Sequence, residues 1–227
     1  MKKLIGILMI ITLLIAGISV FASDIDGNKY SINDNLIEEL SQDIDGYTEI
    51  ENMPKDLINA VVAIEDKRFF SHSGFDLVGI GRAFVNNIKA GEIKEGGSTI
   101  SQQLAKNLFL SNEKTLNRKA KELILSIKLE EKYTKEEILE MYLNVIYLGD
   151  GAYGVQDASK KYFNKDVSQL TTEECAMLAG LPQAPSLYNP KKYINRAKKR
   201  QKMVIKAMVE EGFIEEGFVK KGTLKPI

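Results

Sequence analysis

From residue 53 onward, apolar residues recur with the period of an α-helix. The first run places Leu57, Val61 and Ile64 on one face, behind a proline, Pro54, that suits the first turn. Neither a convincing alternation of period two nor an internal repeat interrupts this pattern, so we predict a mainly α-helical domain. Further helices are expected over 77–90, through Ile100, Leu104 and Leu108, over 116–132, behind capping boxes at Thr134 with Glu137 and at Thr171 with Glu174, and over about 195–211.

The N-terminus is typical of a membrane signal. Lys2 and Lys3 precede an apolar run over 4–22 that is just long enough to span a bilayer, and the lysines should stay cytoplasmic. A cleaved signal is the alternative, because 20–22 fits a signal-peptidase site, but the length of the run favours an anchor. Either one exports the rest of the chain. We therefore divide the chain into four segments: 1–22, an anchor or signal; 23–52, an acidic stem; 53–214, the main domain; and 215–227, a tail.

The net charge of the 227 residues is zero, but the charges are unevenly distributed. Residues 23–52 hold nine acids and one cation, which leaves 28 cations and 22 acids from Met53 onward. A basic domain suits an anionic ligand or an anionic membrane surface, although a solvated charge mixture would look the same. Residues 189–208, with eight cations and no acid, could face a membrane, and nucleic acid is a poorer partner for an exported domain. The single Cys175 rules out an internal disulfide framework.

Glu65 is the first candidate for chemistry, because it falls on the apolar face of its helix and near the helix end. Burial and the helix dipole both raise the pKa of a carboxyl group there, toward the range that a general base needs. An ion pair with Lys67 or Arg68 is the plainer explanation. Asp66 is expected to accept structural hydrogen bonds, and His72, the only histidine, to order a turn rather than to bind a metal.

Two further clusters carry polar and charged side chains. Gly96 and Gly97 lead into a helix start where free backbone N–H groups suit an anion, and the pattern is not that of a P-loop. The following turns could bind sugar hydroxyls or phosphate, or form a solvated face, through Gln102, Gln103, Lys106 and Asn107. In the second cluster, Arg118 and Glu122 are spaced for an intrahelical ion pair, yet Arg118 with Lys119 would also make a pyrophosphate clamp.

Taken together and in order, these motifs resemble one family, the peptidoglycan glycosyltransferases of family 51. Its members occur as monofunctional enzymes and as the N-terminal half of class A penicillin-binding proteins. The resemblance implies a lysozyme-like helical head, a smaller membrane-proximal jaw lobe, and polymerisation of lipid II into β-1,4 glycan strands. It covers about residues 53–214, and the matching stretches are Glu65–Asp76, Gly97–Asn107, Arg118–Glu122, Lys135–Gly149 and Arg200–Val204.

The resemblance also implies roles for single residues. Glu65 would be the general base that takes the proton of the acceptor's 4-hydroxyl, and Glu122 would be the second essential carboxylate, near the donor's pyrophosphate. A divalent cation, Mg²⁺ or Mn²⁺, could assist the clamp. The implied substrate-binding residues are Ser98, Gln102, Gln103, Lys106, Asn107, Arg118, Lys119, Arg82 and Lys114, and the implied structural residues are Asp66, Phe69, His72, Gly74 and Asn144.

The chain departs from the family at Lys114, where many relatives have an arginine, so bidentate contact would be lost there. The Ser-x-x-Lys motif of a transpeptidase is missing after residue 214. Expected partners are lipid II, the growing glycan strand, the bilayer and other cell-wall synthesis proteins, with the domain outside the cell membrane. Two alternatives remain: a lysozyme-like peptidoglycan hydrolase, and a scaffold that binds lipid II without turnover.

Overall fold

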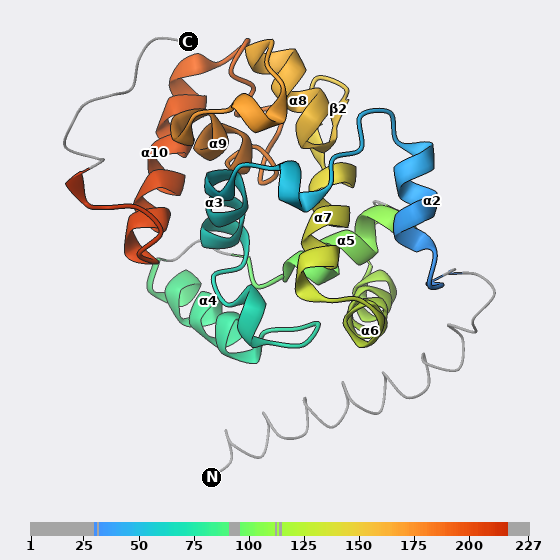
Figure 1. Ribbon diagram of the computed structural model, residues 1–227. Helices are drawn as coiled ribbons and strands as arrows, with labels where there is room; N and C mark the ends of the chain where they lie inside the picture. Colours follow the sequence, from blue (N-terminus) through green and yellow to red (C-terminus); the bar gives the residue numbers. More distant parts are fainter. Residues whose placement is uncertain (1–29, 31, 91–95, 112, 114, 218–227) are drawn as a thin grey trace.

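The computed structural model describes residues 30, 32–90, 96–111, 113 and 115–217. Within these residues the protein is mainly helical, as predicted, and contains a single two-stranded sheet (Figure 1). The elements are α2 (Leu36–Asp43), η1 (Ile50–Asn52), α3 (Lys55–Glu65), η2 (Phe69–Ser71), α4 (Leu77–Ala90), α5 (Ile100–Phe109), α6 (Leu116–Lys132), α7 (Lys135–Val145), β1 (Tyr147–Gly149), β2 (Ala152–Tyr153), α8 (Gly154–Phe163), η3 (Val167–Gln169), α9 (Thr172–Ala179) and α10 (Ile194–Glu210), where η marks a short 3-10 helix.

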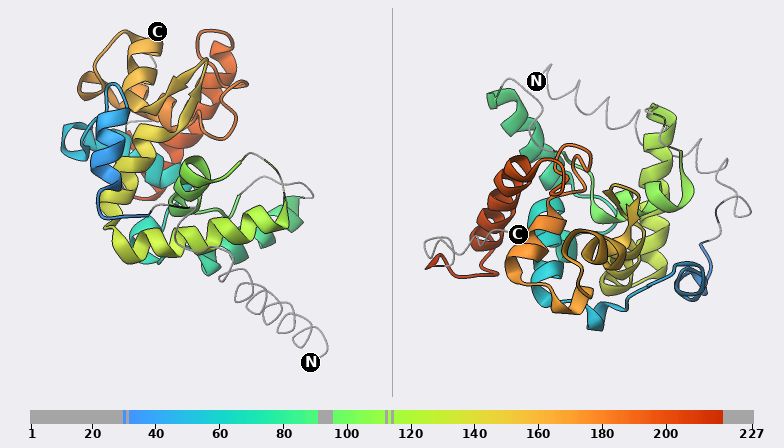
Figure 2. Two further views of the ribbon diagram at one scale, coloured as in Figure 1. Left: turned by 90° about the vertical axis from the view of Figure 1, so that its right-hand side faces the viewer. Right: turned by 90° about the horizontal axis from the view of Figure 1, so that it is seen from above.

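The core forms between two groups of helices. Helix α3 packs against α9 and α10, and α5 packs against α6 and α7. Leu57 of α3, Leu104 of α5 and Tyr142 of α7 are fully buried in one continuous apolar cluster. Helices α4 and α6 lie at one end of the molecule, and α8 and α9 lie at the other (Figures 1 and 2). Burial of these apolar faces is what orients the helices that carry the charged motifs.

Local signals in the sequence set several helix ends. Helices α4 and α6 have the expected bounds, and the capping boxes at Thr134 and Thr171 form as predicted. A further capping box joins Thr99 to Gln102 at the start of α5. Helix α10 begins and ends one residue earlier than expected. A capping box satisfies two backbone donors at a helix start, so the signal is strong where it occurs.

Helix α8 and the β1–β2 hairpin were not predicted. The two strands are three and two residues long, too short for an alternation to be visible, and a bulge shifts their register. Helix α8 starts at Gly154 without a side-chain cap, so the sequence carries no capping signal that would predict its start. Gly154 has φ +75°, and a Cβ atom there would lie 2.5 Å from the backbone oxygen of Asn144. This close approach of the start of α8 to α7 therefore requires glycine.

The second half of the predicted stem is part of the folded unit. Helix α2 buries Leu36 in the core, and the segment after it is tied to α7. Tyr47 Oη donates to Glu140 Oε1 at 2.7 Å, and the Ile50 N–H donates to Glu140 Oε2 at 2.9 Å. The acidic character that suggested a stem comes from the exposed side chains of this segment. The folded unit thus begins well before residue 53.

None of the helices among the described residues combines the length and the apolar character that a bilayer crossing requires. The predicted anchor or signal over 1–22 lies outside the described residues. Residues 218–227, which make up most of the predicted tail, also lie outside them.

We predict that Asn144→Ala destabilises the fold. The buried amide accepts from the Thr48 N–H at 2.8 Å and donates to the backbone oxygens of Thr48 and Glu140 at 2.8 and 2.9 Å. Leaving these groups without a partner should lower the free energy of unfolding by about 2–3 kcal/mol, measured by urea denaturation. Asn195→Ala, at an exposed position of α10, is the control and should change little. Equal stability of both variants would contradict the prediction.

Candidate active site

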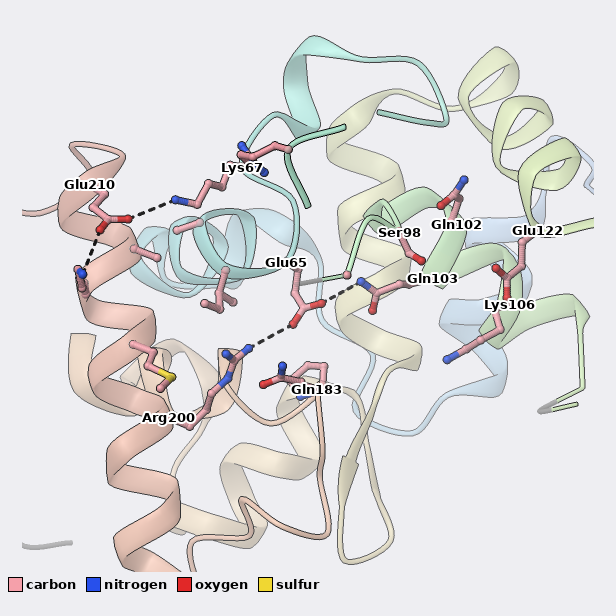
Figure 3. Close-up of a pocket in the computed structure, with 18 of the residues that line it drawn as sticks. Glu65, Lys67, Ser98, Gln102, Gln103, Lys106, Glu122, Gln183, Arg200 and Glu210 are labelled. Atoms are coloured by element: carbon pink, nitrogen blue, oxygen red, sulfur yellow. Dashed lines mark hydrogen bonds and ion pairs between the residues drawn. The ribbon is translucent and has the colours of Figure 1, made fainter. Parts of the chain in front are cut away.

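A pocket of about 780 Å³ opens between the end of α3, the starts of α5 and α6, the loop after α9, and α10 (Figure 3). It is lined mainly by polar and charged groups rather than by apolar ones. These are Glu65, Lys67, Arg82, Ser98, Gln102, Gln103, Lys106, Arg118, Lys119, Glu122, Gln183, Arg200, Lys206 and Glu210. Most of the predicted site residues therefore meet in one cavity, although they come from widely separated parts of the chain.

Glu65 is the last residue of α3, and its side chain is 13% exposed. Gln103 Nε2 donates to Glu65 Oε2 at 2.9 Å, and Arg200 Nη2 lies 4.0 Å from Glu65 Oε1. The two groups approach the carboxylate from opposite sides (Figure 3). Burial raises the pKa of Glu65, and the negative charge of Asp66 adds to this, while Gln103, Arg200 and Lys106 act in the opposite direction. A carboxylate with a raised pKa is suited to accept a proton near neutral pH.

The residues that follow Glu65 form a buried support behind it. Asp66 accepts from the backbone N–H of Ile100 at 3.1 Å, and His72 Nε2 lies 3.0 and 2.9 Å from its two oxygens. Because the Asp66 carboxylate can only accept, His72 Nε2 is the donor in this contact. Phe69 is fully buried against the His72 ring. This segment therefore fixes the end of α3 to the start of α5.

Gly74, which ends this support, has φ +74°. A Cβ atom there would lie 3.0 Å from the backbone nitrogen of Ile127 in α6. Both the left-handed backbone and the close contact require glycine at this position. Asn144, the fifth residue expected to be structural, lies in α7 and joins that helix to Thr48, outside the pocket.

A cluster of cations lies beyond Gln103, at the start of α6 and on the facing side of α5. Lys119 Nζ lies 2.6 Å from Glu122 Oε2 and donates to Ser98 Oγ at 2.9 Å, and Arg118 forms an ion pair with the same carboxylate. Burial lowers the pKa of Lys119 to about 8, and the positive charges of Arg118 and Lys106 contribute. Burial and Arg118 also lower the pKa of Lys106. Two of the three cations, Arg118 and Lys119, contact the carboxylate of Glu122, and the repulsion among the three favours an anionic ligand.

The remaining predicted binding residues are distributed unevenly. Arg82, from α4, and Gln102, which also caps α5, line the pocket. Asn107 lies on the exposed face of α5 and is not part of the lining. Lys114 lies outside the described residues. The expected polar face of α5 therefore enters the pocket through its first two turns only.

Arg200 and Gln183 line the pocket but were not predicted as site residues. Arg200 belongs to a stretch that we matched to the family, and it is a buried cation within the apolar face of α10. Its Nε donates to the backbone oxygen of Gly180 at 3.2 Å, which directs the guanidinium toward Glu65. A cation at an apolar helical position was the available signal. Gln183 lies in a loop, where the sequence offers no such signal.

No group of three or more His, Cys, Asp or Glu side chains converges on a metal position within the part of the chain that the structure describes. Glu122, the acid next to the cation cluster, is occupied by Arg118 and Lys119. These residues do not form a metal site by themselves.

Comparison with known proteins identifies the family. The family model described as "Transglycosylase" matches residues 33–209. Penicillin-binding protein 1A of Neisseria cinerea is 50% identical over 181 residues, which cover 80% of this chain and 23% of that protein. The protein of the same name from Aquifex aeolicus is 45% identical over 228 residues, covering 92% of this chain and 31% of that protein. The chain belongs to the transglycosylase family.

The chain spans less than a third of the length of these two relatives. A search of solved structures finds the 2.6 Å crystal structure of penicillin-binding protein 1A from Haemophilus influenzae, with a TM-score of 0.39 and 34% identity. That match covers 56% of this chain and 16% of the crystallised chain.

We predict that Glu65→Gln stabilises the fold at alkaline pH. A carboxyl group whose pKa is raised by folding supports the fold below its ordinary value of 4.5, and this support is lost as the pH rises through its folded-state pKa. The neutral amide avoids the buried charge, so unfolding at pH 8 should require about 1 kcal/mol more than in the parent protein. Urea denaturation between pH 5 and pH 8 should show the difference shrinking toward acid.

Glu131→Gln, at an exposed position on α6, is the control for this measurement and should follow the parent protein at every pH. A Glu65→Gln protein that is less stable than the parent at pH 8 would contradict the prediction, because it would show that the ionised carboxylate stabilises the folded state.

Proposed function

We propose that this chain is a peptidoglycan glycosyltransferase that polymerises lipid II into β-1,4-linked glycan strands. The observation that carries the proposal is that Glu65 and a cluster of three cations, Lys106, Arg118 and Lys119, line the same pocket. The transglycosylase family match supports the same reaction. A base and a diphosphate-binding cluster are the two groups that transfer of a sugar from a lipid diphosphate requires.

In the proposed reaction, Glu65 accepts the proton of the 4-hydroxyl of the acceptor's N-acetylglucosamine. The oxygen attacks C1 of the donor's N-acetylmuramic acid from the face opposite the diphosphate, so the new bond is formed with inversion. The C1–O bond to the diphosphate breaks, and its electron pair leaves on undecaprenyl pyrophosphate. Lys106, Arg118 and Lys119 would stabilise the negative charge that develops there.

The proposed role of Glu122 is to hold the cation cluster rather than to move a proton. It is 3% exposed and in contact with both Arg118 and Lys119. A diphosphate is a stable leaving group and does not need the protonated carboxylic acid that a sugar leaving group requires. The carboxylate would then keep two cations side by side until the diphosphate arrives.

The pocket argues against the two alternatives. A lysozyme-like hydrolase needs a carboxyl pair flanking a glycosidic bond and has no use for Lys106, Arg118 and Lys119. A scaffold that only binds lipid II has no need for a buried carboxylate of raised pKa, which destabilises the fold. Both features are accounted for together by glycosyl transfer from a diphosphate.

We further propose a lysozyme-like head, with α4 in the smaller, membrane-proximal lobe. Exposed apolar side chains on α4 support this placement: Leu77, Val78, Ile80, Val85 and Ile88. The chain would be held at the extracytoplasmic face of a bacterial membrane by residues 1–22 and would meet the growing glycan strand and other cell-wall synthesis proteins there. Mg²⁺ or Mn²⁺ would bind mainly through the diphosphate of the substrate.

We predict that Glu65→Gln abolishes polymerisation while the fold is retained, because the amide cannot accept the proton. The loss should be a hundredfold or more in kcat, measured with labelled lipid II in detergent with Mg²⁺, and Glu131→Gln should keep the parent rate. Polymer from the Glu65→Gln protein would remove Glu65 from its proposed role. Release of sugar fragments from finished peptidoglycan by the parent protein, in place of polymer, would favour the hydrolase.

We predict an alkaline limb in the pH profile of kcat/KM. Lys119 binds the diphosphate as a cation, and its pKa of about 8 means that it loses its charge as the pH rises through that value. Because kcat/KM reports the free enzyme, it should fall there by about tenfold per unit until the neutral form dominates binding. Lys119→Arg, which stays charged, should move this limb to higher pH. Lys121→Arg on the same helix is the control, and an unmoved limb in Lys119→Arg would assign it to another group.

A further inference from the structure

Three consecutive residues at the start of α5 are each bound to a different element. Thr99 Oγ1 donates to the backbone oxygen of Gly74 at 2.8 Å, and the Ile100 N–H donates to Asp66 Oδ2 at 3.1 Å. Ser101 Oγ donates to Glu130 Oε1 on α6. All three α5 residues are almost completely buried. The first turn of α5 is therefore held from three sides, by the segment after η2, the end of α3 and the second half of α6.

Glu130 is a buried carboxylate that the proposed reaction does not use. Its side chain is 6% exposed and does not line the pocket. Lys135 Nζ, at the start of α7, lies 2.6 Å from Glu130 Oε2, and His72 Nδ1 lies 4.0 Å from Glu130 Oε1. His72 also contacts Asp66 through Nε2. Glu130 thus completes a buried charged group that reaches from α7 to the residue next to Glu65.

The hydrogen bond from Ser101 lies two residues before a contact with the proposed base. Gln103 donates to Glu65 at 2.9 Å and accepts from Tyr142 Oη at 3.1 Å. The Gln103 hydrogen bond lowers the pKa of Glu65 against the effect of burial. A hydrogen bond weakens steeply with distance and angle, so a small displacement of α5 would change the proton affinity of Glu65.

We propose that Glu130 is a positioning residue for the reaction: through Ser101 it holds the start of α5 so that Gln103 meets Glu65. This inference rests on the proposed function for its effect on rate. Glu130 touches no substrate in this account, because it lies behind the pocket wall. A charged acceptor makes a stronger and shorter hydrogen bond than a neutral one, which explains why a carboxylate occupies this place.

Glu130→Gln is the variant that tests the proposal, and Glu131→Gln is its matched control. Both replace a glutamate by its amide on neighbouring positions of α6, but Glu131 is exposed. In Glu130→Gln we expect kcat to fall about tenfold with KM for lipid II within about twofold, since only the alignment of the base changes. A purely stabilising Glu130 would lower the melting temperature and leave the kcat of the remaining folded enzyme unchanged, which would overturn the proposal.

Titration of Glu65 supplies a second measurement that needs no substrate. The groups facing Glu65 are Asp66 beside it, Gln103 and Lys106 from α5, Tyr142 from α7 and Arg200 from α10. Of these, Gln103 is the one that α5 presents to Glu65 at hydrogen-bond distance. Carbon-13 NMR of the full chain in detergent, labelled at glutamate carboxyls, should report a higher pKa for Glu65 in Glu130→Gln and no change in Glu131→Gln.

The same shift should move the acidic limb of kcat to higher pH, because the base must be ionised to act. If the parent protein made no polymer but Glu130→Gln still shifted the titration, the proposed function would fail and the positioning role would stand. An unshifted titration in a folded Glu130→Gln protein would remove the positioning role and leave the proposed function intact.

Ser101→Ala checks the route of the effect. It deletes the hydroxyl that joins α5 to Glu130, and it should reproduce the fall in kcat and the shift of Glu65. The double variant Ser101→Ala with Glu130→Gln should be no slower than the more affected single variant, because both remove one interaction. Fully additive losses in kcat would show that Glu130 acts by another route and would overturn the inference.

Discussion

A carboxylate held at the buried end of α3 is the constraint on which the rest of the pocket depends. Glu65 ends its helix, where the dipole disfavours negative charge, and burial raises the pKa of its carboxyl group further. Two groups reduce this penalty: Gln103, from α5, by a hydrogen bond, and Arg200, from α10, by its charge. While Glu65 stays buried at the end of α3, its ionised form is therefore stabilised by the contacts that α5 and α10 make with it. The packing of these three helices thus sets the proton affinity of Glu65.

In the cation cluster the partly buried charge is positive, and one buried acid on α6, Glu122, neutralises part of it. Lys106 and Lys119 are partly desolvated and near Arg118, so their charged forms are disfavoured without a ligand. Glu122 neutralises part of this charge from within the helix, which places the cations at fixed positions. In the proposed reaction, the diphosphate of the donor would relieve the remaining repulsion, most of all as negative charge develops on the leaving oxygen. Repulsion among the cations therefore raises the free energy of the unliganded pocket, and a bound dianionic group would lower it.

The parts of this structure that local chemistry dictates could be predicted from the sequence. Helix ends at Ala90 and Lys132, and the capping boxes at Thr134 and Thr171, follow from signals within a few residues. Helix α8 and the hairpin lack such signals, and the segment after α2 is tied to α7 by a hydrogen bond between residues 90 positions apart, Ile50 and Glu140. These features are set by tertiary packing, which overrides local propensity.

The pocket residues divide in the same way, into those that local patterns predict and those whose position depends on tertiary packing. Glu65 stood out as an acid on an apolar face, and Arg118 as a cation spaced for an ion pair with Glu122 on its own helix. Arg200 did not stand out as a site residue, because the direction of its long side chain depends on the carbonyl of Gly180, 20 residues away. Asn107 was grouped with the pocket-facing residues of α5, but it is exposed and does not line the pocket. Spacing predicts a face of a helix, and packing decides how much of that face a pocket uses.

Three of the pocket residues lie within two residues of a buried anchor. Glu65 precedes Asp66, Ser98 precedes Thr99, and Gln103 follows Ser101 by two positions. A side chain so close to a fixed backbone has few conformations left, so the anchors add to the contacts that the pocket residues make with one another. Glu130 does not line the pocket. From α6, the helix that also carries Arg118 and Lys119, it fixes one of these anchors, Ser101 of α5. A buried hydrogen bond therefore connects α6 to the helix start that carries Gln103, and a change at that bond should alter the proton affinity of Glu65, the proposed base.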